Sequence, residues 1–245
     1  MSTTATAIGG LDWAHIGTRL GQDGYAVLPG LLNRAQARAL ARLPDTTCGA
    51  VGSSPLATVG FTLAPAASKR GGGDVLQFGQ NLPEPLRTWH PDFYRHLADV
   101  ANSWNELLEI DARYPSAIAD FRTLNRRCGQ RRAQSGLIRL REGDYQALHQ
   151  HAEGEQVFPL QLIVLLSEPG EDFAGGEFVM TEQRPRMQSR PTVVPLRSGD
   201  AAIIATARRP VKGVNGYYRV NLKHAISRVH QGERISLEWL FHDAA

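Results

Sequence analysis

The segment DYQALHQHAEGEQVFPLQLIVLLSEPG, residues 144–170, decides the fold that this sequence predicts. Its first part, DYQALHQH, is a short run that carries two histidines near its end, whereas its second part is the apolar run VFPLQLIVLLS, which ends near a Pro-Gly turn. Short runs between turn residues are typical of strands, and a strongly apolar run of this kind is typical of a buried one. The segment therefore predicts two consecutive β-strands.

Two histidines, His149 and His151, lie two positions apart at the end of the first of these strands. Side chains at positions i and i+2 of a strand point to the same face. Both imidazoles could therefore reach one metal ion, which makes this stretch a candidate metal site.

The chain after about residue 136 repeats this strand pattern. Short apolar runs separated by Gly, Pro and Asp form eight candidate strands: SGLIRL, DYQALHQH, VFPLQLIVLLS, GEFVMT, TVVPLR, DAAIIAT, YYRVNLKHAIS and ERISLEWLFH. Many short strands of this kind predict a β-sandwich or jelly roll. We therefore expect a mainly β fold with flanking helices and a double-stranded β-helix (jelly roll) core.

The part of the chain before this core is expected to be mostly helical. Residues 33–43 read as a helix with Asn33 as its N-cap, and residues 91–110 and 115–130 carry apolar residues at helical spacing. Residues 24–32 read as a strand that turns at its Pro-Gly pair.

We expect a single domain over residues 1–245. Residues 1–10 are small and polar and are expected to be disordered, residues 11–135 form the mostly helical part, and residues 136–244 form the jelly-roll core. The tripeptide GGG at 71–73, in a stretch rich in Gly, Ser, Pro and Ala, predicts a flexible loop.

Composition limits the partners and the cellular location. Hydrophobic residues make up 42% of the chain, and the net charge of +3 does not by itself indicate a nucleic-acid partner. No apolar run approaches the roughly 18 residues of a membrane span, and the N-terminus lacks the pattern of a secretion signal. We therefore expect a cytoplasmic protein with no membrane partner, in which Cys48 and Cys128 are reduced thiols. The sequence leaves the oligomeric state open.

A third histidine and an arginine complete the candidate site. His224 lies on the seventh predicted strand, and the second and seventh strands of a jelly roll are neighbours, so His224 could join the first two histidines. Arg234 follows on an adjacent strand, after a turn expected at Gln231-Gly232. An arginine there could bind a carboxylate through two parallel hydrogen bonds, and Ser236, on the same face, could add a hydroxyl.

This combination resembles the Fe(II)/2-oxoglutarate-dependent oxygenases, whose usual signature is His-x-Asp or His-x-Glu, a distal His, and an Arg or Lys further along. Several segments look like a prolyl-hydroxylase-like bacterial branch of that superfamily, some members of which are described as acting on damaged DNA: GYAVLPGLL, ANSWNE, EGDYQALHQ, VFPLQ, LLSEPGEDFAGGEFVMTEQRPRMQSR, VVPLRSGD, YRVNLKHAISRV and FHDA. The resemblance is strong over residues 136–244 and weaker before them. Residues 50–85 look unlike that branch, which indicates a different substrate.

The resemblance implies an Fe(II)/2-oxoglutarate-dependent dioxygenase, with Fe(II) as cofactor, 2-oxoglutarate and O₂ as cosubstrates, and ascorbate as a supporting reductant. His149, His151 and His224 would bind the iron, and Arg234, with Ser236, would bind the distal carboxylate of 2-oxoglutarate. Decarboxylation of 2-oxoglutarate to succinate would then drive hydroxylation, ring closure or desaturation of the substrate.

Two positions depart from the family pattern. Leu140 stands where an aromatic residue often helps to bind 2-oxoglutarate, and His151 stands where a carboxylate is usual. Two imidazoles and a carboxylate leave an Fe(II) site with about one positive charge, whereas three imidazoles leave about two. Three hypotheses stay open. His151 binds the metal, or it turns away and leaves a position for water, halide, substrate or Glu153, or the metal site is lost.

A second family offers a rival interpretation. Gly143, His149, His151 and Glu155 satisfy the first motif of the cupins, which bind metal through three histidines and a glutamate. The glycine expected later in that motif is Leu162, and the second cupin motif is absent. A three-histidine, cupin-like dioxygenase would not use 2-oxoglutarate, so this alternative concerns the reaction itself.

The sequence does not identify the substrate. We expect a small organic molecule such as an amino acid derivative or a biosynthetic intermediate. An alkylated nucleic acid, or a binding role with a degraded metal site, is the alternative.

The arginines of residues 125–132 and 182–190 could clamp an anion, but without interleaved aromatic residues a solvated surface is the simpler interpretation. The remaining histidines are interpreted as surface or core residues: His15, His90, His96, His230 and His242.

Overall fold

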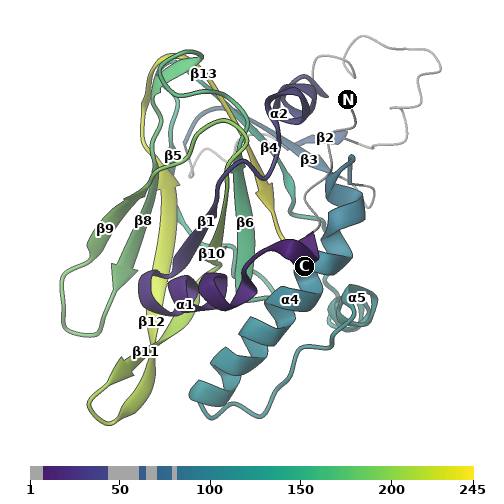
Figure 1. The fold of residues 1–245 in the computed structure, drawn as a ribbon, viewed down its shortest axis with the longest axis vertical. Helices are drawn as coiled ribbons and strands as arrows, with labels where there is room; N and C mark the ends of the chain where they lie inside the picture. Colours follow the sequence, from purple (N-terminus) through teal and green to yellow (C-terminus); the bar gives the residue numbers. More distant parts are fainter. Residues whose placement is uncertain (1–7, 44–60, 65–70, 79–81) are drawn as a thin grey trace.

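The computed structural model describes residues 8–43, 61–64, 71–78 and 82–245 of the chain. Its strands form two antiparallel sheets, and α4 and α5 lie on the side of the larger sheet away from the smaller one (Figure 1). The helices are α1 (Trp13–Asp23), α2 (Arg34–Ala41), α4 (Leu86–Leu107) and α5 (Ile118–Arg127).

The sheets have the connectivity of a jelly roll. The larger sheet has the strand order β1-β10-β6-β13-β4-β3-β2, with β7 paired to β13, and the smaller has β11-β12-β8-β9, with β5 paired to β12. The strands are β1 (Tyr25–Leu28), β2 (Phe61–Ala64), β3 (Asp74–Phe78), β4 (Gly136–Arg141), β5 (Gln146–His149), β6 (Leu160–Leu165), β7 (Phe173–Gly175), β8 (Phe178–Gln183), β9 (Arg190–Val194), β10 (Ala201–Ala205), β11 (Arg208–Gly213), β12 (Gly216–Ile226) and β13 (Val229–Trp239). The predicted mainly β class is confirmed.

All eight strands predicted after residue 136 are present, and two further strands were not predicted. The strand β7 has only three residues, too few to show a period. The strand β11 has the sequence RRPVKG, whose charges, proline and glycine read as a turn. Because β11 is an edge strand, Pro210 can lie in it without breaking the interior of the sheet.

The chain changes sheets between β12 and β13. The expected turn at Gln231-Gly232 is wrong, because β12 ends at Ile226 and β13 begins at Val229. Gly232 instead lies inside β13 with φ 78°, and a Cβ there would come 2.1 Å from the carbonyl oxygen of Asp172. His224 and Arg234 therefore belong to opposite sheets and not to neighbouring strands of one sheet.

The N-terminal half combines the predicted helices with strands of the larger sheet. Asn33 caps α2 in a reciprocal capping box with Gln36, as its position predicted. The helix α4 begins five residues before the predicted start at 91 and contains Pro91, and α1 lies in the part expected to be mostly helical but was not predicted as a separate helix. Contrary to the expected disorder of residues 1–10, residues 8–10 form a 3₁₀ turn, while residues 1–7 lie outside the described part.

The expected flexible loop at 71–73 is packed where the structure describes it. Gly71 forms a bridge with Gln146 of β5 and has φ 112°. A Cβ on Gly71 would come 2.0 Å from the carbonyl oxygen of Tyr145, so this glycine permits a close approach of two backbones. Most of the divergent segment 50–85, like Cys48, lies outside the described residues.

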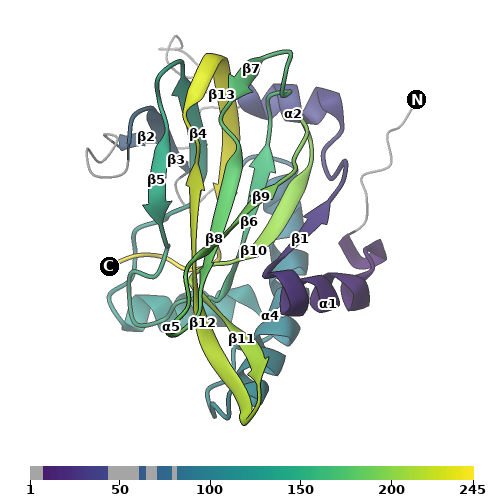
Figure 2. The ribbon, with the colours of Figure 1, turned by 90° about the vertical axis from the view of Figure 1, so that its left-hand side faces the viewer.

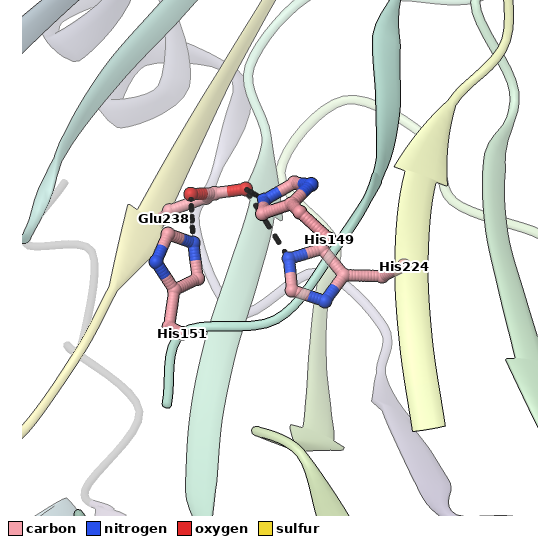
Figure 3. A group of neighbouring side chains, drawn as sticks. All are labelled: His149, His151, His224 and Glu238. Atoms are coloured by element: carbon pink, nitrogen blue, oxygen red, sulfur yellow. Dashed lines mark hydrogen bonds and ion pairs between the residues drawn. The ribbon is translucent and has the colours of Figure 1, made fainter. Parts of the chain in front are cut away.

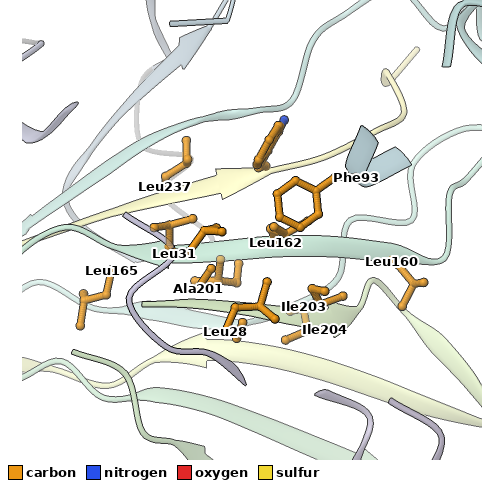
Figure 4. Packing of buried hydrophobic residues seen from close by; sticks show 14 of the residues in the cluster. Leu28, Leu31, Phe93, Leu160, Leu162, Leu165, Ala201, Ile203, Ile204 and Leu237 are labelled. Atoms are coloured by element: carbon orange, nitrogen blue, oxygen red, sulfur yellow. The ribbon is translucent and has the colours of Figure 1, made fainter. Parts of the chain in front are cut away.

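The strand β13 lies in the middle of the larger sheet and separates two environments. It pairs with β4 on one side and β6 on the other. Phe93 of α4 contacts Trp239 with ring centroids 5.4 Å apart, and Figure 4 shows Phe93 above Leu162. Because side chains alternate along a strand, Arg234, Ser236 and Glu238 in the last part of β13 share the face that points between the two sheets. None of the described helices is long and apolar enough to cross a membrane.

Candidate metal centre

Strand pairing brings the first two histidines together. His149 of β5 and His224 of β12 are directly opposite each other in the antiparallel register, so their side chains share a face. Their ring centroids are 4.2 Å apart, and both residues are buried. The predicted meeting of the second and seventh core strands is thus present in the structure.

His151 joins this pair from the segment that follows β5. Its ring centroid lies 5.0 Å from that of His149 and 5.5 Å from that of His224. Its carbonyl oxygen accepts a hydrogen bond of 3.1 Å from Nε2 of His242. Burial, together with the charge of His151, lowers the pKa of His242 to about 4, so His242 is a neutral donor that fixes this backbone.

A fourth residue, Glu238, completes the cluster and was not predicted. Its Oε2 accepts a hydrogen bond of 2.8 Å from Nε2 of His151, and its Oε1 lies 3.8 Å from Nε2 of His149 and 3.6 Å from Nε2 of His224. The four ligand atoms all lie within 4.8 Å of one another. Figure 3 shows the carboxylate between the ring of His151 and the other two rings.

The sequence carried one signal for this glutamate. Arg234, Ser236 and Glu238 alternate with Ile235 and Leu237 on a strand whose last six residues are all buried. Three polar side chains on one face of a buried strand require polar partners. That pattern places Glu238 on the face of Arg234, towards the histidines of the other sheet.

The charges in the cluster suit a cation. Burial alone would raise the pKa of Glu238, but the adjacent His151 and His224 outweigh it and hold that pKa well below its ordinary value. Burial, with repulsion from His224, lowers the pKa of His149 to about 4, so His149 is neutral near pH 7. Its Nδ1 donates a hydrogen bond of 2.9 Å to Ala147 O, which leaves the Nε2 lone pair facing the cluster.

Unsatisfied atoms show that these residues fit a metal ion. Nε2 of His149 and Oε1 of Glu238 are buried and have no hydrogen-bond partner among the described residues. Metal bonds of about 2.1 Å place neighbouring ligands about 3 Å apart, so the observed separations need only small side-chain movements. A cation at this point would satisfy both atoms at once.

Arg234 lies on the same face of β13 and is 1% exposed. Its Nε donates a hydrogen bond of 2.7 Å to Gly176 O, and its Nη1 donates one of 2.7 Å to the hydroxyl of Ser236. Burial lowers its pKa to about 10, so it remains a cation near pH 7. No carboxylate of the described residues forms an ion pair with it, and it borders a cavity of about 270 Å³. Arg234 and Ser236 therefore form a candidate anion site.

Two alternatives from the sequence do not agree with the structure. Glu153, which could have filled the position of the missing carboxylate, forms an exposed ion pair of 3.0 Å with Arg132. Glu155, the glutamate of the cupin motif, is exposed and lies outside the cluster. Leu140 is buried opposite Arg234, so the usual aromatic contact is absent at that position.

A cavity of the described part lies away from the cluster. Its volume is about 410 Å³, and its walls include Trp104, Tyr114, Gln150, Arg208 and Arg219. None of the four clustered residues lines this cavity, so it is separate from the candidate metal centre.

Comparisons with known proteins agree with this geometry. The family model described as "Oxygenase, catalysing oxidative methylation of damaged DNA" matches residues 73–244. A protein of Mycobacterium tuberculosis strain ATCC 25618 / H37Rv, "Uncharacterized protein Rv2227", is 38% identical over 152 residues, which cover 62% of this chain. The match spans 65% of the length of that relative.

Two solved structures share the fold over nearly the whole chain. A prolyl-4-hydroxylase of Pseudomonas putida has a TM-score of 0.54 and 14% identity, with 95% of this chain and 99% of that chain covered. A 2OG-Fe(II) oxygenase family oxidoreductase of Burkholderia pseudomallei has a TM-score of 0.51 and 16% identity, with 96% and 94% covered. The predicted resemblance to the Fe(II)/2-oxoglutarate-dependent oxygenase superfamily is thus confirmed at the level of the fold. Since the family model matches more than half of the chain, the chain belongs to the oxygenase family that this model describes.

Proposed function

We propose that this chain is a non-haem Fe(II)/2-oxoglutarate-dependent oxygenase. The observation that supports the proposal is the alternation of Arg234, Ser236 and Glu238 along β13, which would set a cation site and an anion site on one buried face. Binding of Fe(II) and of a dicarboxylate requires these two sites side by side. When bound, iron with 2-oxoglutarate and O₂ would supply the oxidation of a substrate C–H bond, coupled to release of succinate and CO₂.

Arg234 and Ser236 would bind and orient the distal carboxylate of 2-oxoglutarate. Gly176 O holds one edge of the guanidinium through Nε, which leaves other donors of the planar group for a ligand. Because Arg234 is buried, its charge-assisted bonds would form with little competition from water. Leu140 lies opposite Arg234 on the neighbouring strand, and its apolar side chain would keep water away from the guanidinium.

We propose a small organic molecule as the substrate. All four clustered residues are less than a tenth exposed, so little of their surface is open to a bulky substrate. A base within a duplex would have to be turned out of its stack to enter such a site, at a cost of a few kcal/mol.

A nucleic acid is the second candidate, and two observations favour it. The family is described as acting on damaged DNA. The cationic face, which we define as Arg208, Lys212, Arg219 and Lys223, lies on one side of β11 and β12 by their pairing register, and all four side chains are exposed. The one carboxylate on the strands of the smaller sheet, Glu182, pairs with Arg209 and not with this face.

Turnover of 2-oxoglutarate tests the proposal. Purified protein with Fe(II), O₂ and ascorbate is expected to form succinate from 2-oxoglutarate, and addition of the true substrate should raise that rate. Protein that holds iron but forms no succinate would exclude the proposal in favour of a dioxygenase that does not use 2-oxoglutarate. Protein that holds no iron would instead indicate a binding role.

A further inference from the structure

We propose that Glu238 supplies the carboxylate ligand of the metal, and that His151 holds this carboxylate in place instead of binding the metal itself. The ligand set would then be His149, His224 and Glu238. This inference rests on the proposed function, because it assumes that the cluster binds iron. In the usual His-x-Asp signature the carboxylate ligand would stand at position 151. The inference places this ligand at position 238, on the larger sheet.

The two oxygens of Glu238 have different surroundings. Oε1 faces Nε2 of His149 at 3.8 Å and Nε2 of His224 at 3.6 Å, and it has no hydrogen-bond partner. Oε2 accepts the 2.8 Å hydrogen bond from His151. Oε1 is thus available to bind a metal together with the two imidazoles, whereas Oε2 already accepts a hydrogen bond from His151.

His151 is placed as a hydrogen-bond donor. Its Nε2 carries the proton of the bond to Oε2, so that nitrogen has no lone pair to offer a metal while the bond exists. Its ring is also further from the rings of His149 and His224 than these two are from each other. A ligand carboxylate that is itself hydrogen-bonded is the usual arrangement around protein metal sites.

The assignment accounts for the charge and for the open positions of the iron. Two neutral imidazoles and one carboxylate leave Fe(II) with about one positive charge, as in the usual facial triad. Three protein ligands on an octahedral ion keep three positions free, which is what a chelating 2-oxoglutarate and O₂ need. Binding by all four clustered residues would keep only two.

Counting imidazole ligands in the wild-type protein is the direct test. We expect X-ray absorption of the anaerobic Fe(II)-loaded protein to show two imidazoles, and His151→Gln, which keeps an N–H donor, to show two as well. Three imidazoles in the wild type would overturn the inference. The decisive count is made on the wild type, so a misfolded variant cannot obscure the outcome.

Titration with Mn(II) gives a second readout. Glu238→Gln is expected to weaken Mn(II) binding by about 100-fold or more, whereas His151→Gln should weaken it by less than about 10-fold. The double variant His151→Asp/Glu238→Ala is expected to recover most of the lost affinity, because the carboxylate returns to the usual position. Equal losses in the two single variants, or no recovery, would contradict the assignment.

A matched control separates local from general effects. Glu233→Gln alters a half-buried glutamate of the same strand, which pairs with Arg141 away from the cluster, and should leave Mn(II) affinity unchanged. If the wild type binds neither Mn(II) nor Fe(II), the proposed function fails together with this inference. If it binds them through three imidazoles, only the inference fails.

Discussion

At the scale of single residues, the buried charge of Arg234 lowers the stability of the ligand-free protein but provides a cation that can bind 2-oxoglutarate. Burial lowers its pKa and outweighs the attraction of the nearby Glu238 and Glu177, neither of which forms an ion pair with it among the described residues. Arg234→Met is therefore expected to raise the melting temperature of the ligand-free protein while it raises the KM for 2-oxoglutarate by about 10- to 100-fold, the loss of one or two charge-assisted hydrogen bonds.

Thermal melting and steady-state kinetics check this prediction. Arg139→Met is the matched control, because Arg139 lies on the adjacent strand β4 and pairs with Glu233. It should leave the KM for 2-oxoglutarate unchanged. A lower melting temperature together with an unchanged KM in Arg234→Met would show that this arginine is only structural.

Gln161 is a second residue whose role depends on what fills the site. It is fully buried on β6, its Nε2 lies 3.4 Å from Nε2 of His224, and its Oε1 has no partner. A metal on His224 would take the lone pair that the amide faces, so Gln161 would need a new partner on the bound cosubstrate. Gln161→Leu is expected to weaken 2-oxoglutarate binding about 10-fold with little change in Mn(II) affinity.

Calorimetric titration of 2-oxoglutarate into the Mn(II)-loaded protein measures this effect. Gln130→Leu is the control, because Gln130 is equally buried but accepts from Gln156 N and donates to Gln156 O and Asp243 O. It should lose stability without losing 2-oxoglutarate affinity. Unchanged affinity in Gln161→Leu would remove Gln161 from the binding site.

At the scale of elements, strand periodicity predicted the part of the fold that places the site. The eight core strands follow from short apolar runs, and the meeting of His149 with His224 follows from their places in a jelly roll. The sheet change before β13 did not follow, because the close backbone contact at Gly232 depends on Asp172, far along the chain. Glu238 belongs to no spacing of the oxygenase motif, so only the alternation of polar residues on its strand indicates it.

The contact between α4 and β13 predicts acid sensitivity of the fold. His90 stacks on Trp239 and Phe241, and burial, with the charge of Arg122, lowers its pKa from 6.5 to about 3. Below pH 6.5 the unfolded chain binds this proton and the folded chain does not, so the free energy of unfolding falls as the pH falls towards 3. At pH 5 the loss from His90 should be about 2 kcal/mol.

Urea unfolding at pH 7.5 and pH 5.0 measures that loss. His90→Phe keeps the aromatic stack and removes the titrating group, so its loss between the two pH values should be about 2 kcal/mol smaller than that of the wild type. The buried His242 contributes in the same direction and remains in the variant. An identical loss in both proteins would mean that His90 is not held neutral.

At the scale of the whole molecule, charge is distributed unevenly along the chain. Residues 184–223 contain nine Arg or Lys residues and one acidic residue, Asp200, although the net charge of the chain is only +3. Figure 2 shows β11 and β12, which carry the cationic face, extending as a hairpin beyond the rest of the smaller sheet. A surface of this kind attracts polyanions whatever molecule is oxidised in the buried centre.

We therefore expect single-stranded DNA to bind weakly, with an affinity that falls as salt rises. Each phosphate contact contributes about 0.7 to the slope of log affinity against log salt concentration for a single strand. Lys212→Ala/Lys223→Ala should therefore lower that slope by up to about 1.4, and Arg19→Ala, on α1 and paired with Asp23, should not change it. Fluorescence anisotropy at several salt concentrations measures the slope. A flat response would end the nucleic-acid alternative and leave the small-molecule substrate, since a protein that acts on DNA must first bind its phosphates.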